Sequence, residues 1–81
     1  MQPLKVEEFK KTYSTTTKKI SGFTEEQYKE LEHMDYRDMK KQVLDELNAR
    51  NNGIGKLWLE NYGVLSMWTR ENAVYVEIGN S

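Results

Sequence analysis

The residues best suited to chemistry lie near the amino terminus, in the stretch KKTYSTTTKK of residues 10–19, here called the basic segment. It contains four lysines, four threonines, one serine and one tyrosine, and no acid. Lysine and hydroxyl side chains are ordinary ligands of phosphate oxygens, and an extended segment can place several of them along a nucleic-acid backbone. An equally good interpretation is a solvated linker between a helix and a strand.

The charge of the chain is unevenly distributed. Residues 1–23 carry five lysines against two glutamates, a net of +3, and residues 24–81 carry seven basic against eleven acidic residues, a net of −4. The total of −1 argues against a general electrostatic affinity for nucleic acid. It leaves room for a local basic surface.

Catalytic chemistry finds little support in the sequence. The only histidine, His33, lies in ELEHMDY, where Glu32 or Asp35 would be its acid–base partner. A surface histidine at a helix end is the better interpretation. The nearby acids lack the spacing of a calcium loop, and NNGIGK lacks that of a phosphate loop. We therefore predict no enzyme, no cofactor, no metal and no small-molecule substrate.

The length and composition predict one small domain. A chain of 81 residues buries only about 60% of its unfolded surface, so its core is marginal. It has no cysteine, which excludes disulfides and thiolate zinc sites and fits a reducing compartment. We find no apolar run near the roughly 18 residues of a membrane span and no signal peptide. The expectation is a soluble cytoplasmic protein with no membrane partner.

The elements that must position the basic segment begin with a predicted helix over residues 3–13. Val6, Phe9 and Tyr13 fall at i, i+3 and i+7, which is one helical stripe. The β-branched threonines that follow favour a strand over residues 16–20.

Two further helices are marked by their start signals. Thr24 and Gln27 form a capping box for a helix over residues 25–33. Asp35 is placed to cap a second helix over residues 36–50. In one continuous helix the two apolar stripes would diverge, so a break at residues 34–35 is favoured.

The last third of the chain predicts strands from Lys56 onward. Gly63 suits the loop of a first hairpin, and Asn72 suits a second loop over residues 70–72. That loop pairs Trp68 with Val74, Ser66 with Val76, and Val64 with Ile78, on a face toward the helices. Met67, Tyr75 and Leu65 then fall on the opposite face. The rings of Trp58, Tyr62, Trp68 and Tyr75 serve either core packing or a platform for bases or a protein partner.

The second helix offers a further binding surface. One flank of its apolar stripe carries Arg37, Lys40, Lys41 and Asn48, and the other carries three acids. Basic and amide groups on one flank suit phosphate and base contacts. A solvated amphipathic helix is the competing and slightly better interpretation.

The order helix, short strand, helix, turn, helix, hairpin resembles the winged helix-turn-helix family of DNA-binding proteins. The resemblance implies an α+β, winged-helix-like domain of three helices followed by a β-hairpin or a three-stranded antiparallel meander. It also implies that the helix after the turn enters the major groove and that the hairpin is a wing. Thr69, Arg70 and Asn72 would then form the wing tip.

We therefore predict a small sequence-specific DNA-binding protein, a repressor or a plasmid or phage accessory factor, that binds double-stranded DNA as a homodimer. The alternative is a protein–protein interaction module, such as a small inhibitor or adaptor, that uses its aromatic sheet face. The predicted DNA-binding residues are Lys10, Lys11, Lys18, Lys19, Arg37, Lys40, Lys41, Asn48, Thr69, Arg70 and Asn72.

Overall fold

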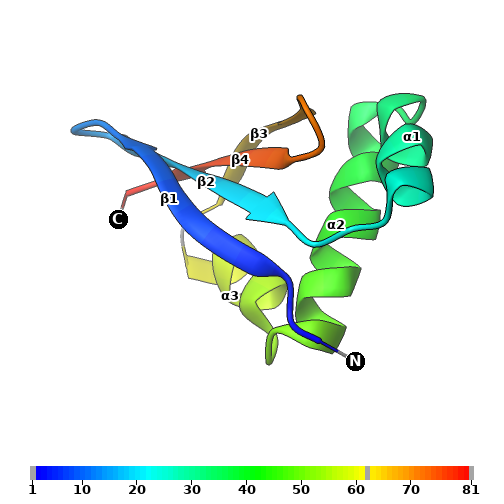
Figure 1. Cartoon of the computed structure of the whole chain (residues 1–81). Coiled ribbons are helices and arrows are strands. Elements are labelled where there is room, and N and C mark those ends of the chain that lie inside the picture. Colours follow the sequence, from blue (N-terminus) through cyan, green and yellow to red (C-terminus); the bar gives the residue numbers. More distant parts are fainter. Residues whose placement is uncertain (1, 62, 81) are drawn as a thin grey trace.

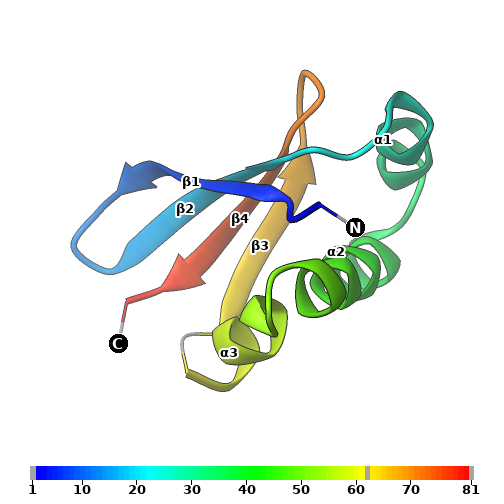
Figure 2. The same ribbon diagram turned by 60° about the horizontal axis from the view of Figure 1, so that its bottom comes forward.

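Two β-hairpins enclose a helical middle in this chain (Figure 1). A computed structural model describes residues 2–61 and 63–80. The elements are β1 (Lys5–Lys11), β2 (Thr15–Ser21), α1 (Glu25–Glu32), α2 (Tyr36–Arg50), α3 (Ile54–Asn61), β3 (Val64–Thr69) and β4 (Val74–Gly79). The strands form one antiparallel sheet in the order β1-β2-β4-β3, with the two hairpins joined through β2 and β4 (Figure 2).

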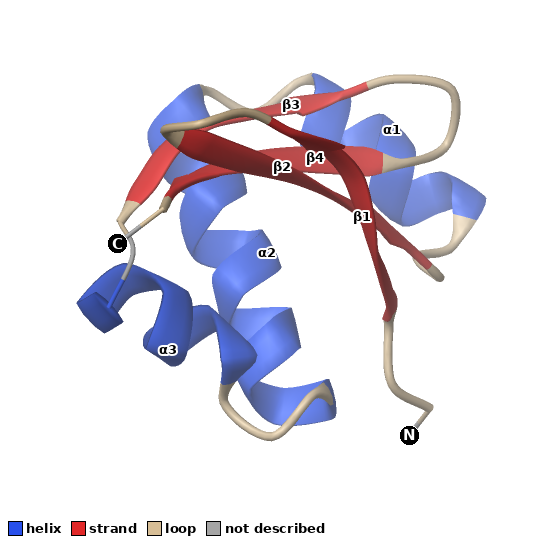
Figure 3. Ribbon diagram, turned by 90° about the vertical axis from the view of Figure 1, so that its left-hand side faces the viewer, coloured by secondary structure: helices blue, strands red, loops and turns tan. Residues whose placement is uncertain are grey.

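The helices lie on one face of the sheet. Figure 3 shows the sheet as one layer with the helices on one side of it and no element on the other. We call that other side the outer face. The core lies between the layers and contains Ile20, Val74 and Val76 from the central strands and Val43 and Leu47 from α2, each with no exposed surface.

The winged-helix architecture predicted from the sequence is wrong. The chain is α+β, but its helices do not precede a hairpin; instead strands come first and the helices occupy the middle. The predicted helix over residues 3–13 is β1. Only Val6 of its stripe packs on the core, whereas Phe9 and Tyr13 are exposed. Pairing with β2 therefore stabilises this segment. Val6, Phe9 and Tyr13 do not form the buried helical stripe that the sequence predicted.

The prediction of two separate helices is confirmed. The Thr24 hydroxyl accepts a hydrogen bond from the Gln27 N–H at 3.1 Å, and the Gln27 side chain accepts one from the Thr24 N–H at 2.8 Å. The Asp35 carboxylate accepts one from the Asp38 N–H at 2.8 Å. Each cap satisfies N–H groups that the first turn of a helix leaves free. The predicted strand at residues 16–20 is also confirmed, as β2.

The prediction of a strand from Lys56 is wrong, because residues 54–61 form α3. A side chain at Gly55 would stand 2.6 Å from the Leu44 carbonyl oxygen, so glycine lets α3 approach α2 closely. The Asn48 amide oxygen accepts a hydrogen bond from the Lys56 N–H at 2.7 Å, in the first turn of α3. Tyr62, in the loop predicted around Gly63, lies outside the described residues.

The carboxy-terminal hairpin exists, but its loop is one residue shorter than predicted. Arg70 and Ala73 exchange backbone hydrogen bonds, so only Glu71 and Asn72 form the loop. The observed pairs are Thr69 with Val74, Trp68 with Tyr75, Met67 with Val76, and Ser66 with Glu77. The predicted pairs of Trp68 and Ser66 are thus wrong, while Val64 with Ile78 is confirmed because an irregularity between Val64 and Ser66 restores the register.

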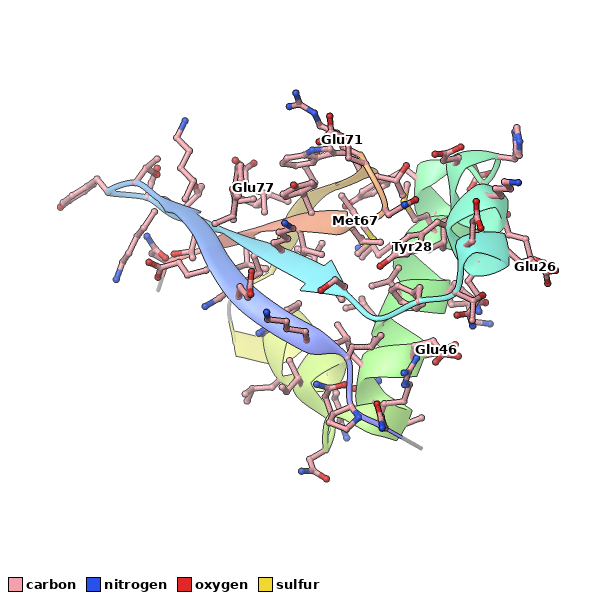
Figure 4. The ribbon with its side chains drawn as sticks, viewed as in Figure 1. Glu26, Tyr28, Glu46, Met67, Glu71 and Glu77 are labelled. Atoms are coloured by element: carbon pink, nitrogen blue, oxygen red, sulfur yellow. The ribbon has the colours of Figure 1, made fainter. Side chains whose placement is uncertain are left out.

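A one-residue shift exchanges the two faces of a strand. Met67 is therefore a core residue, and Trp68 lies beside Tyr75 on the outer face, the reverse of the sequence prediction for both β3 residues. Figure 4 shows Met67 and Tyr28 between the sheet and α1, whereas Glu77 lies on the far side of the sheet.

Candidate functional site

The basic segment forms the outer end of the β1–β2 hairpin, which projects from the body of the molecule (left in Figure 1). Lys10 pairs across the strands with Thr17, and Lys11 with Thr16. Because successive side chains of a strand point to opposite faces, Lys18 and Lys19 separate. Lys11 and Lys18 face the helical side, whereas Lys10 and Lys19 lie on the outer face.

The ammonium groups of this segment are available to a ligand. Within the part of the chain that the structure describes, the ion pairs join Lys5 to Glu7 and Arg50 to Glu46, and neither involves a lysine of the basic segment. The segment itself contributes no acid. The hairpin therefore carries four lysines without an ion pair among the described residues, with Glu8 and Glu7 opposite Lys18 and Lys19.

The hydroxyl groups of the segment have a different role. The Thr12 hydroxyl donates to the Thr15 carbonyl at 3.1 Å and accepts from the Thr15 N–H at 3.0 Å, which closes the turn. Thr16 and Thr17 are buried, and the Thr16 hydroxyl lies 2.6 Å from the Asn80 amide oxygen. The hydroxyls of Thr12 and Thr16 thus hold the hairpin together, which leaves the lysines as the charged ligands for phosphate.

Asn80 connects the carboxy terminus to this turn. Its side-chain amide donates to the Thr12 carbonyl at 3.0 Å and to the Tyr13 carbonyl at 3.4 Å. Its backbone N–H donates to the Ser14 carbonyl at 2.9 Å. The hairpin end is thus held in place by a residue from the other end of the chain.

The base of the hairpin carries a close ion pair. Lys5 Nζ lies 2.8 Å from a Glu7 carboxylate oxygen. This hydrogen bond, with the attraction between the charges, raises the pKa of Lys5 and lowers that of Glu7. Lys19, opposite Glu7 on β2, adds a smaller lowering effect on the pKa of Glu7. The pair partly neutralises Glu7, an acid of the outer face that lies opposite Lys19 of the basic segment.

A groove of about 500 Å³ lies on the helical side of the hairpin. Lys11, Lys18 and Glu8 line it on the sheet side, and Leu57 and Trp58 of α3 form an apolar wall. Its charges are therefore mixed, with two lysines and one glutamate.

The outer face carries three aromatic side chains in contact. The Phe9 and Tyr75 rings meet edge to face with centroids 4.8 Å apart, and the Tyr75 and Trp68 rings are stacked at 5.7 Å. Phe9 is 57% exposed and Trp68 37%, whereas Tyr75 between them is 8% exposed. We call these three residues the aromatic ridge; it crosses the sheet from β1 to β3.

The helical residues predicted to bind DNA are less suited to that role. Lys41 shares a shallow surface depression with Asp38 and Asp45. Lys40 Nζ lies 5.8 Å from the centre of the Tyr36 ring, a cation–π contact. Asn48 uses its amide oxygen in the first turn of α3, as described above, and Arg37 is exposed at the start of α2. The helix therefore presents mixed charge in place of a basic stripe.

The predicted wing tip is a two-residue turn closed by the hydrogen bonds between Arg70 and Ala73. Glu71 and Asn72 have φ angles of 50° and 59°, and two positive φ angles in a two-residue loop define a type I′ turn. Thr69 and Arg70 precede this loop, and Arg70 is exposed. Side chains at alternate positions share a face, so Arg70 extends the outer-face row of Trp68.

Comparison with known proteins gives no assignment, since no protein-family model, curated protein or solved structure matches the chain. The described residues contain no cluster of three or more histidines, cysteines, aspartates or glutamates that would hold a metal ion. No helix within residues 2–61 and 63–80 is both long and apolar enough to cross a membrane.

Sequence reasoning named the lysines, and it left Trp68 and Tyr75 as either core residues or a platform for a ligand. It missed the part of Phe9 in the aromatic ridge, because Phe9 was assigned to a helical stripe. The contact between Phe9 and Tyr75 depends on the strand order, for which there is no local signal in the sequence.

Proposed function

We propose that the protein binds nucleic acid through its basic segment. The observation that carries this proposal is the set of four lysines in the β1–β2 hairpin, none of which forms an ion pair among the described residues. Lys10 and Lys11 adjoin the turn, and Lys18 and Lys19 lie in the middle of β2, opposite Glu8 and Glu7. Lys10 and Lys19 on one face and Lys11 and Lys18 on the other give the hairpin end two positive sides. Phosphate groups can approach it from either side.

The charge distribution supports this use of the hairpin. Residues 24–81 carry a net charge of −4, so the rest of the protein repels a nucleic acid while the hairpin attracts it. Such a separation of charge orients an approaching polyanion toward the basic end. The mixed charges of α2 make a helix in the major groove a poor candidate, and the proposal does not use one.

The test is the salt dependence of binding, measured by fluorescence anisotropy with labelled DNA. Each lysine that contacts a phosphate contributes roughly 0.7–0.9 to the slope of log K against log salt. Replacing Lys10, Lys11, Lys18 or Lys19 singly by glutamine should lower the slope by about that amount. Lys29→Gln, an exposed lysine of α1, is the matched control and should change the slope little. Equal effects at all five positions would contradict a specific role for the hairpin.

A protein partner is the second candidate, and the observation that favours it is the aromatic ridge. Aromatic residues are enriched at the centres of protein interfaces. The charged residues around the ridge, among them Lys19, Glu7 and Glu77, are of both signs, as in the rim of such an interface. If the protein does not bind DNA or RNA even at low salt, this candidate replaces the first.

A further inference from the structure

The aromatic ridge and the basic segment share the outer face of the sheet. Lys19 is the direct cross-strand partner of Tyr75, and Tyr75 is the partner of Trp68. Residues opposite each other on neighbouring strands project to the same side of the sheet. Lys10 follows Phe9 in β1, and the β-bulge between Glu8 and Lys10 lets both lie on the outer face, at the other end of the ridge.

Positive groups therefore accompany the ridge along its whole length. Lys10 lies beside Phe9, Lys19 beside Tyr75, and Arg70 two residues beyond Trp68. Successive ring centroids along the ridge are 4.8 and 5.7 Å apart. The exposed fractions of Phe9 and Trp68, 57% and 37%, leave surface on both for further stacking.

We propose, on the basis of the nucleic-acid function inferred above, that the ligand is single-stranded and that its bases stack on Phe9 and Trp68. Proteins that bind single strands combine a positive path for the backbone with aromatic side chains on which the bases stack. In a duplex, base faces are covered by neighbouring bases and cannot reach the rings. Only an unpaired strand uses both the lysines and the ridge.

The acids of the outer face define how the strand can lie. Glu7 is held by Lys5 at 2.8 Å and faces Lys19 across the strands, so its charge is partly compensated. Glu77 is opposite Thr17 and has no ion pair within the described residues. The carboxylate of Glu77 repels phosphate groups, so the backbone of the bound strand passes over β1 and β2, on the side of Lys10 and Lys19. Replacing Glu77 by glutamine should therefore tighten binding.

The first experiment compares three labelled probes of about 12 nucleotides, oligo-dT, oligo-U and a duplex, by anisotropy at fixed salt. Single strands should bind more tightly than the duplex. Phe9→Leu and Trp68→Leu keep apolar side chains at the ridge but remove the stacking surface. Each should weaken single-strand binding on the order of 5- to 100-fold and leave duplex binding unchanged. Leu57→Gln, which alters an exposed apolar residue on the helical side, is the control.

A second experiment reports stacking directly. Trp58 is buried and Trp68 is partly exposed, so Trp58→Phe leaves Trp68 as the single indole emitter. Addition of oligo-dT should quench its emission, and the quenching should be lost in excess salt. If Trp58→Phe does not fold, the same titration of the parent protein shows the quenching above the constant emission of Trp58.

The outcomes separate the two proposals. Single-strand preference with loss in both ridge variants supports this inference. Equal binding of duplex and single strand, with no effect of Phe9→Leu or Trp68→Leu, overturns it while the basic segment remains a nucleic-acid site. No binding of any probe overturns both, and a protein that binds through the ridge becomes the explanation.

Discussion

The two hairpins of this protein close their turns by different means. In the β3–β4 hairpin the backbone alone makes the turn, because Glu71 and Asn72 adopt left-handed conformations and Arg70 and Ala73 exchange both hydrogen bonds. In the β1–β2 hairpin Tyr13 and Ser14 have no positive φ. There the Thr15 N–H bonds to the Thr12 hydroxyl.

The second turn also depends on a distant residue. Asn80 donates to two carbonyls of the β1–β2 turn and lies within hydrogen-bond distance of Thr16. The β3–β4 turn uses no such partner among the described hydrogen bonds. A hairpin end that carries four lysines repels itself, so side-chain ties from the rest of the fold have to hold it in shape.

The strands of the two hairpins also differ in burial. β4 is buried at four of its six residues, whereas β1 has no buried residue. In the β1–β2 hairpin the buried residues are Thr16, Thr17 and Ile20 of β2, whereas β1 and the turn are open to solvent. Within this hairpin, β2 therefore stabilises the fold, while β1 and the turn are free to bind a ligand.

The largest expected effect is at the anchored base. Ile20 has no exposed surface and pairs with Val6 on one side and Val74 on the other. Ile20→Ala should lower the free energy of unfolding by about 2–5 kcal/mol, since it removes buried methyl groups and leaves a cavity. Urea denaturation measures this. Lys10→Gln, next to the turn in β1, is the comparison and should change stability by no more than about 0.5 kcal/mol, because Lys10 is exposed.

The next effect is at the tie between the chain ends. Asn80→Ala removes three side-chain hydrogen-bond contacts and leaves the buried Thr16 hydroxyl without its Asn80 partner. We expect a loss of about 1–3 kcal/mol, the cost of an unsatisfied buried polar group. Hydrogen exchange should show faster opening at the β1–β2 turn and unchanged protection at β3–β4. Equal acceleration in both hairpins would contradict the difference between their turns.

A third, smaller effect distinguishes the turns by backbone chemistry. Asn72→Val should destabilise the protein by about 1–2 kcal/mol, because a β-branched side chain resists a φ of 59°. Asn72→Gly should be neutral or stabilising, since glycine adopts this conformation freely. Ser14→Val is the matched change in the other turn and requires no positive φ. Thermal melts of the three variants would show whether only the β3–β4 turn depends on a left-handed residue.

Features set by neighbouring residues were predictable from the sequence, and features set by distant pairing were not. The caps at Thr24 and Asp35 follow from side chains three residues apart. The β1 strand was mistaken for a helix because Val6, Phe9 and Tyr13 have helical spacing, although Val6 packs on the core and Phe9 contacts Tyr75 on the outer face. Of the candidate site, the lysines were visible, but their division between two faces required the pairing of β1 with β2.

The smallest expected effect concerns the ion pair at the hairpin base. Lys5 lowers the pKa of Glu7 in the folded protein. The ion pair therefore stabilises the fold fully at pH values above the unfolded glutamate pKa of about 4.3. This contribution is lost as the pH falls through the lower pKa of the folded state. The pKa of Lys5 is raised, so its contribution is lost only at strongly alkaline pH, above the ordinary lysine range. Both side chains are exposed, and exposed ion pairs contribute little. We therefore expect Lys5→Gln to raise the pKa of Glu7 in an NMR titration while the melting temperature at neutral pH changes hardly at all. A large loss of stability would show that the β1–β2 hairpin depends on charge pairing as well as on the burial of Ile20. Burial alone would then not explain how this hairpin is held to the rest of the fold.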